Sequence, residues 1–85
     1  MLPLKLRVLI GRNVRRLRVE ADLTQEELAF RADMDRTYLS DIERGLGNPT
    51  IEMLGAIATV LQVPLVMLLV PEERADAVST ALQAP

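Results

Sequence analysis

The sequence predicts an all-α fold, and three of its properties support this prediction. Hydrophobic residues make up 49% of the 85 residues but aromatic residues only 2%, so aliphatic side chains must fill the core. Sheets are enriched in β-branched and aromatic residues, so this composition suits small helices better. Apolar residues recur at spacings of three and four, and capping residues precede several of these runs. A chain of this length forms one domain at most.

The first helix is expected over about Leu4–Glu20. Ile10, Val14 and Leu17 lie at positions i, i+4 and i+7 and form one apolar stripe. Gly11 is expected to weaken this helix by about 1 kcal/mol relative to alanine.

The second predicted helix covers about residues 25–32. The Thr24 hydroxyl suits an N-cap, and Glu27 follows three residues later, which is the pattern of a capping box. Leu28 and Ala29 are expected to point inward, and the small Ala29 lets a neighbouring helix approach closely.

The third predicted helix follows a turn at residues 33–34. Asp35 supplies its N-cap, the helix covers about residues 36–44, and Gly45 ends it. Two helices separated by so short a turn have the form of a helix-turn-helix unit, here residues 24–45.

Two further helices are expected after the break at Asn48-Pro49. Thr50 caps the fourth, over about residues 51–61. The fifth covers residues 63–70 with Pro64 in its first turn, and it is apolar on nearly all sides. Such a helix needs cover on two sides, and a second copy of the chain is the simplest source of the second cover.

The predicted domain spans residues 1–70, and residues 71–85 form a tail. We expect a homodimer interface formed by three leucines of the fifth helix, Leu65, Leu68 and Leu69. In the tail, helical spacing is kept by Ala75, Val78 and Leu82. The tail is therefore expected either to form a short sixth helix or to have low order, and it is expected to associate with the dimer.

Several classes of function are excluded by what the sequence lacks. It has no cysteine and no histidine, which removes thiolate chemistry, the commonest general base and the commonest metal ligand. We expect no enzyme, no cofactor, no metal site and no small-molecule ligand. No segment reaches the roughly 18 apolar residues of a membrane span, and Lys5 and Arg7 spoil the N-terminal run as a signal peptide. A cytoplasmic location is expected.

The net charge of −2 weakly opposes a nucleic-acid partner, but the charges are unevenly distributed. Residues 1–48 carry nine basic and eight acidic residues, whereas residues 49–85 carry one and four, giving net charges of +1 and −3. An acid-free basic run consists of Lys5, Arg7, Arg12, Arg15, Arg16 and Arg18. This run is open to two interpretations, a contact with DNA phosphate or a solvated face.

The third helix carries the residues expected to read bases. Leu39 and Ile42 face the core, and N-terminal residues of such a helix reach base edges. Arg36 can bond bidentately to guanine, and Thr37 can bond to a base or pack on a thymine methyl group. Asp41 can accept from a cytosine amino group or instead orient a neighbouring arginine.

Phosphate contacts are expected from residues that surround the base-reading ones, namely Gln25, Tyr38, Ser40 and Arg44. Gln25 stands at the start of the second helix, where its side chain and nearby backbone N–H groups suit a phosphate.

Four segments resemble the Cro/repressor-type helix-turn-helix family, also called the xenobiotic response element family: Arg15–Arg18, Leu23–Ala29, Tyr38–Gly45 and Asn48–Thr50. The resemblance covers roughly residues 8–70. It implies a compact five-helix, lambda-repressor-like domain and a dimeric transcriptional regulator, a repressor or autoregulator, that binds a palindromic operator in double-stranded DNA. By position it implies a phosphate-clamping role for Gln25, a phosphate contact for Asn48 and a buried ion pair between Arg18 and Glu43.

The sequence departs from the family in the turn after the second helix, where Asp33 replaces the usual glycine. Aspartate tolerates the left-handed conformation better than most residues, so the turn is expected to survive with some strain. The runs Arg36–Tyr38 and Ile42–Gly45 also resemble restriction–modification controller proteins, a branch of the same family. The alternative is a protein-interaction module, such as an antitoxin, on a helix-turn-helix scaffold.

Overall fold

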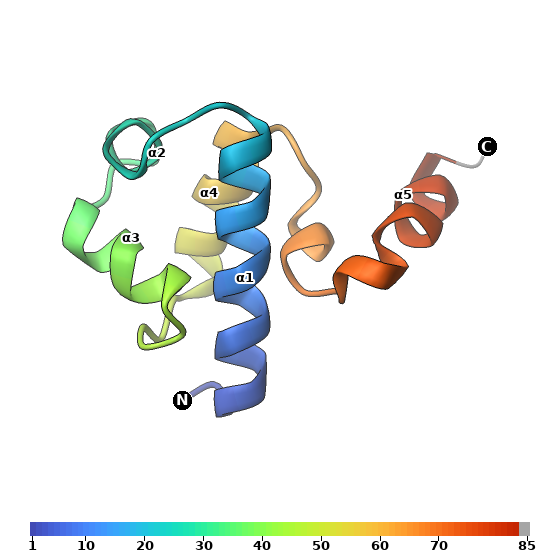
Figure 1. Cartoon of the computed structure of the whole chain (residues 1–85), viewed down its shortest axis with the longest axis horizontal. Coiled ribbons are helices and arrows are strands. Elements are labelled where there is room, and N and C mark those ends of the chain that lie inside the picture. The colour runs from blue at the N-terminus through green and yellow to red at the C-terminus, as the bar shows by residue number, and fades with distance from the viewer. Residues whose placement is uncertain (84–85) are drawn as a thin grey trace.

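The computed structural model describes residues 1–83, and within that range the chain is all-helical (Figure 1). Its elements are α1 (Leu4–Glu20), α2 (Gln25–Arg31), α3 (Arg36–Glu43), α4 (Ile51–Leu61), the 3-10 turns η1 (Leu65–Leu68) and η2 (Glu72–Arg74), and α5 (Ala75–Gln83). α1 stands at the centre, with α2 and α3 on one side of it and α5 projecting from the other. The predicted all-α class is confirmed.

The core lies between α1, α3 and α4. Ile10 and Val14 of α1 are buried against Leu39 and Ile42 of α3, together with Ile57 of α4. Ile10 and Val14 belong to the apolar stripe from which the first helix was predicted. The predicted bounds of α1 and α4 are confirmed, and α2 and α3 each end one residue earlier than expected.

Gly11 brings α1 and α3 into direct backbone contact. A Cβ atom at this position would stand 2.8 Å from the Glu43 carbonyl oxygen and closer still to that of Ile42. Both obstacles are backbone atoms at the end of α3, so they cannot rotate away. The expectation that Gly11 merely weakens a helix was therefore incomplete, because the glycine allows the two helices to touch.

Gly11→Ala is expected to destabilise the fold by about 1–3 kcal/mol, although alanine is the better helix former. The steric cost outweighs the roughly 1 kcal/mol of helix propensity because the clash is with backbone oxygens. Urea unfolding measures the change. Gly55→Ala is the matched control, since a Cβ at Gly55 meets no atom within 4 Å and the propensity gain should be seen alone. A stabilised Gly11→Ala chain would contradict the close packing of α1 on α3.

The turn between α2 and α3 adopts the strained conformation expected from its sequence. Asp33 has φ 55°, in the left-handed region, where glycine is usual. Gly45, with φ 77°, follows α3 in the same region, and so does Gln62, the C-cap of α4, with φ 59°. The aspartate thus fills the role of the absent glycine.

The predicted fifth helix needs correction. Residues 63–70 do not form an α-helix: a 3-10 turn covers only Leu65–Leu68, and Pro64 precedes it as the N-cap. Leu68 is fully buried in the core, so it has no surface to offer a partner and is removed from the predicted interface. Leu65 and Leu69 are half-buried, and the neighbouring Val66 is 37% exposed.

The tail forms the predicted sixth helix, α5, which packs against η1 and η2. α5 buries none of its residues completely, and Leu82 on it is 53% exposed. Part of the cover that the apolar segment 63–70 requires is therefore supplied by the chain's own tail. Residues 84 and 85 of the predicted tail lie outside the described residues.

No helix among residues 1–83 is both long and apolar enough to cross a membrane.

Candidate nucleic-acid interface

α3 exposes polar side chains on the side away from the core. Arg36, Thr37 and Arg44 are exposed, and Ser40 and Asp41 are half-buried, while Leu39 and Ile42 are buried. Asp35 begins the helix, because its Oδ1 accepts a hydrogen bond of 3.0 Å from the backbone N–H of Thr37. The first turn of α3 is therefore fixed in place while its side chains stay free for a partner.

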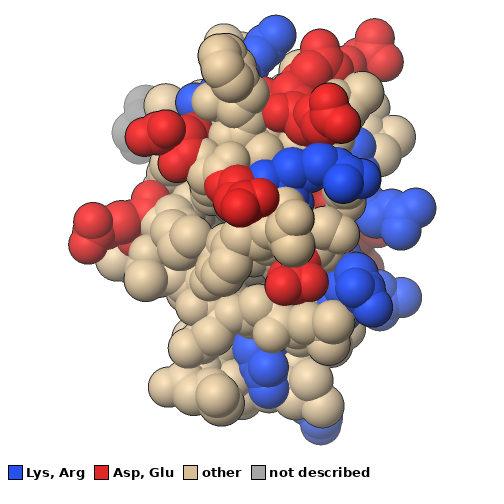
Figure 2. All heavy atoms as spheres, turned by 90° about the vertical axis from the view of Figure 1, so that its left-hand side faces the viewer, with Lys and Arg blue, Asp and Glu red and all other residues tan. Residues whose placement is uncertain are grey.

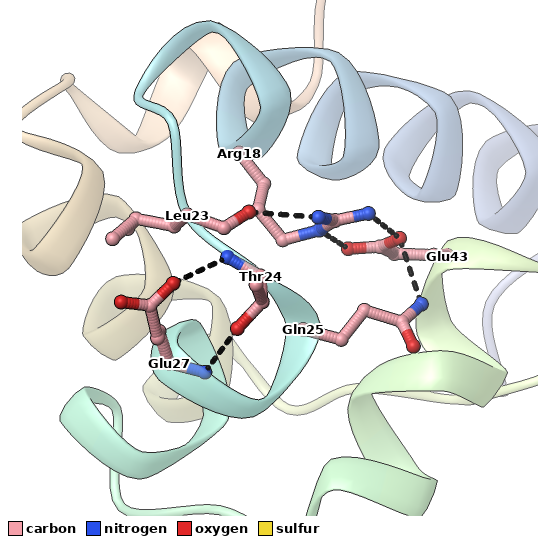
Figure 3. A network of polar contacts seen from close by, with 6 residues as sticks. All are labelled: Arg18, Leu23, Thr24, Gln25, Glu27 and Glu43. Carbon is pink, nitrogen blue, oxygen red and sulfur yellow. Dashed lines mark hydrogen bonds and ion pairs between the residues drawn. The ribbon is translucent and has the colours of Figure 1, made fainter.

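A polar network holds the C-terminal end of α3 to α1 and α2 (Figure 3). Arg18 Nε and Nη2 donate to the two carboxylate oxygens of Glu43 at 2.7 and 3.0 Å, a bidentate ion pair. The side chain of Glu43 is 3% exposed and that of Arg18 is 13% exposed. Arg18 Nη1 also donates to the Leu23 carbonyl oxygen at 2.8 Å. The pair implied by the family resemblance is present, and one guanidinium joins α1, the turn after it and α3.

Gln25 belongs to the same network. Its Nε2 donates a hydrogen bond of 3.0 Å to Glu43 Oε1, so the residue expected to clamp phosphate also helps to fix α3 (Figure 3). An amide nitrogen carries two hydrogen atoms, so one remains for a further acceptor. Sequence reasoning missed this structural role, since nothing local to Gln25 points to a residue eighteen positions away.

The capping box predicted for α2 is confirmed. The Thr24 hydroxyl accepts from the backbone N–H of Glu27 at 3.0 Å, and Glu27 Oε1 accepts from the backbone N–H of Thr24 at 2.9 Å. The backbone N–H of Thr24, and after it the Thr24 side chain, stabilise the charged carboxylate and lower the pKa of the Glu27 carboxyl below its ordinary value.

The capping box makes a prediction about pH. A lowered pKa in the folded state means that the contribution of Glu27 is present above the carboxyl's unfolded pKa. It is lost as the pH falls through the folded pKa. The urea midpoint of wild type should therefore exceed that of Glu27→Ala at pH 6, and this difference should shrink toward pH 3. Glu26→Ala, outside the capping box, is the matched control. A pH-independent difference would contradict the assignment.

An open depression of about 590 Å³ lies beside this network, between the end of α1, the start of α2 and the start of α3. It is lined by Arg18, Val19, Asp22, Leu23, Thr24, Gln25, Glu26 and Arg36. The depression thus brings Gln25 and Arg36 to one place, with two carboxylates at its border.

The charges on this side of the molecule are mixed. Figure 2 looks onto the face that carries α2 and α3, with basic side chains across the upper centre and along the right-hand edge. Acidic side chains lie at the top and left and also in the centre of this face, directly beside the basic ones, and the lower part is largely uncharged. Basic side chains on this face can attract a polyanion, and the acidic side chains beside them limit where it can lie.

Two of the remaining predicted phosphate contacts, Arg44 and Asn48, lie at the other end of α3. Arg44 caps this helix, and Asn48 lies in the loop after it, with both residues exposed. Asn48 Oδ1 accepts a hydrogen bond of 2.9 Å from the backbone N–H of Leu2, so the loop is tied to the N-terminus. Tyr38 is half-buried and packs against the core. Within residues 1–83 no group of carboxylates is arranged to hold a metal ion.

These features define the class of the protein: a capped helix, a short left-handed turn and a second helix whose polar side is exposed form a helix-turn-helix unit. The helix-turn-helix family model HTH_3 matches residues 14–68. The chain belongs to this family, and the relatives named below are transcriptional regulators and control proteins.

Two relatives and one solved structure illustrate the similarity. The HTH-type transcriptional regulator y4dJ of Sinorhizobium fredii is 44% identical over 68 residues, which cover 80% of this chain and 88% of the relative. Control protein C.BamHI of Bacillus amyloliquefaciens is 42% identical over 59 residues, covering 68% and 73%. SinR, a master regulator for biofilm formation, has been solved in complex with DNA. Its chain is 39% identical in sequence and superposes with a TM-score of 0.69, and the match covers 72% of this chain and 98% of the SinR chain. The predicted resemblance to controller proteins is confirmed by C.BamHI.

Proposed function

We propose that the chain is a sequence-specific regulator of transcription that binds double-stranded DNA as a homodimer and inserts α3 into the major groove of each half-site. The observation that carries the proposal is the combination of a free polar surface on α3 with a buried ion pair that fixes its angle. The similarity to SinR, which has been solved in complex with DNA, supports the same role. We propose that the protein acts as a repressor or an autoregulator. It would do so by occupying a promoter, in the compartment that holds the DNA.

Arg36 and Thr37 are proposed to read base edges. Both lie in the first turn of α3 and are exposed, and N-terminal residues of a recognition helix reach the bases. Arginine pairs bidentately with guanine O6 and N7. Asp41 is half-buried one turn later, so we propose for it a contact with a cytosine amino group at the edge of the reading surface.

Phosphate contacts are proposed on both sides of α3. Gln25 uses the amide hydrogen that Glu43 leaves free, and Arg44 and Asn48 lie at the opposite end of the helix with exposed side chains. Tyr38 and Ser40 are half-buried and offer hydroxyl groups between these ends. Contacts of this kind set the register of the protein on the duplex and carry no sequence information themselves.

The second copy is proposed to dock on the side formed by η1 and the tail. Leu65, Val66 and Leu69 leave apolar surface there, and α5 adds the exposed Leu82. α5 projects from the side opposite α2 and α3, so a partner seated on it leaves α3 unobstructed (Figure 1). Symmetric dimers read half-sites about one helical turn apart, which implies a palindromic operator.

Selection from a pool of random duplexes tests the proposal. Wild type is expected to enrich one half-site sequence, repeated with two-fold symmetry, and its affinity should fall steeply between 50 and 200 mM salt because phosphate contacts release counterions. Failure to enrich any sequence would overturn the proposal. Binding of a protein partner that is indifferent to salt and to Arg36→Ala would favour the interaction module instead.

A further inference from the structure

Asn13 is a buried polar residue that belongs neither to the apolar core cluster nor to the proposed DNA-reading surface. It lies on α1 and is 2% exposed. Its Nδ2 donates two hydrogen bonds, one of 2.9 Å to the Leu68 carbonyl oxygen and one of 2.8 Å to the Val70 carbonyl oxygen. Both amide hydrogens of Asn13 therefore bond to the segment that joins η1 to the tail, at least fifty-five residues away along the chain.

The same contact continues outward to the tail. Asn13 Oδ1 accepts a hydrogen bond of 3.2 Å from Arg16 Nη2, and Arg16 Nε stands 3.6 Å from a carboxylate oxygen of Glu72 in η2. Arg16 also lies 3.7 Å from Glu20. Asn13, Arg16 and Glu72 thus hold both ends of the turn that leads from η1 through Pro71 into η2. We call these three residues the tail clamp.

α1 therefore carries two polar attachments on neighbouring turns. Arg18 fixes α3 through Glu43, and Asn13 fixes the segment from which α5 departs. α5 packs on η1 and η2, so its direction follows from theirs. Because both attachments start from α1, the relative positions of Arg18 and Asn13 on this one helix help to fix the angle between α3 and α5.

We propose that Asn13 is a positioning residue that sets the separation of the two DNA half-sites. The inference rests on the proposed dimer, in which α5 and η1 meet the second copy. A fixed angle between α3 and α5 fixes where the partner's α3 lies. The operator spacing then becomes a property of the tail clamp and is independent of the base-reading residues.

The test uses Asn13→Asp in the full chain. This substitution keeps the shape of the side chain but replaces its two donors with an oxygen, which repels the carbonyl oxygens of Leu68 and Val70. Binding is measured on a duplex series built from the half-site that wild type selects, with the centre-to-centre separation changed one base pair at a time. A duplex with a single half-site is included. Ile57→Val, which perturbs the buried core of α4 and leaves the tail clamp intact, controls for lost stability.

Wild type should prefer one separation over its neighbours by at least about tenfold. Asn13→Asp should reduce this preference several-fold while its affinity for the single half-site stays within about twofold of wild type. Glu72→Gln, which removes only the outermost and exposed member of the clamp, should reduce it less and cannot be confused with unfolding. A uniform loss at all separations, like that of Ile57→Val, would show a merely structural role and overturn the inference.

The outcomes separate this inference from the proposed function. If wild type enriches no sequence, the proposed function fails and the inference falls with it. If wild type shows a sharp preference for one separation that both clamp variants retain, the proposed function stands and the positioning role of Asn13 is overturned.

Discussion

Replacement of Glu43 by alanine is expected to lower the free energy of unfolding by about 3–5 kcal/mol. The change leaves the Arg18 guanidinium, whose side chain is 13% exposed, without its bidentate partner and removes the acceptor of the Gln25 amide. A chain of this length has a total stability of roughly 4–13 kcal/mol, so a large share would be lost. Urea unfolding followed by circular dichroism measures the change.

Two further variants make this result specific. Glu73→Ala removes a carboxylate from the exposed turn η2 and should change stability by no more than about 0.5 kcal/mol. The double variant Arg18→Met with Glu43→Leu removes both charges and should recover much of the loss, because no charge is left buried alone. If the double variant is as unstable as the sum of the two single losses, the pair is not the coupled unit that its geometry indicates.

Arg36→Ala is expected to weaken operator binding by about 1–3 kcal/mol, which is roughly a 5- to 150-fold increase in Kd. Arg36 is exposed in the first turn of α3, so its loss should leave folding almost unchanged. The loss should also relax the preference for guanine at one position of each half-site. Titration of the selected operator and of single-base variants gives both quantities.

Arg74→Ala is the matched control for charge. It removes the same type of side chain from η2, away from α3, and should weaken binding far less than Arg36→Ala. Equal losses for the two variants, with discrimination between bases unchanged, would show that Arg36 contributes charge alone.

The parts of the fold that sequence reasoning anticipated are those fixed by local chemistry. Thr24, Asp35 and Thr50 each cap a helix in the structure through the side-chain contact that their residue type predicts. The apolar spacing of α1 and α4 gave their bounds correctly, because a helix with one buried stripe reports its own period.

The parts that sequence reasoning missed depend on contacts between distant segments. Gly11 looks like a weak point of a helix until the end of α3 is seen against it. Asn13 looks like an ordinary surface residue until the carbonyl oxygens after η1 are placed beside it. The sequence wrongly predicts Leu68 in a dimer interface, because an apolar run of this kind shows no periodicity that distinguishes its buried side from its exposed side.

The residues of the proposed interface divide in the same way. Arg36 and Thr37 are accessible as expected, since the polar side of a capped helix is predictable from its spacing. The hydrogen bond from Gln25 to Glu43 was not predictable from the sequence, because it depends on how α2 and α3 lie against each other. Gln25 is thus both an expected phosphate contact and a residue that holds the reading helix α3 in place.

The central claim is that α3 reads the major groove in two half-sites, and methylation interference on the selected operator tests it most directly. Methylation of guanine at N7 modifies only the major groove, where this atom is an acceptor for arginine. Interference is expected at one guanine in each half-site, about one helical turn apart, and it should be lost in the Arg36→Ala variant. Binding that is indifferent to guanine N7 methylation at every position of the operator would contradict the central claim.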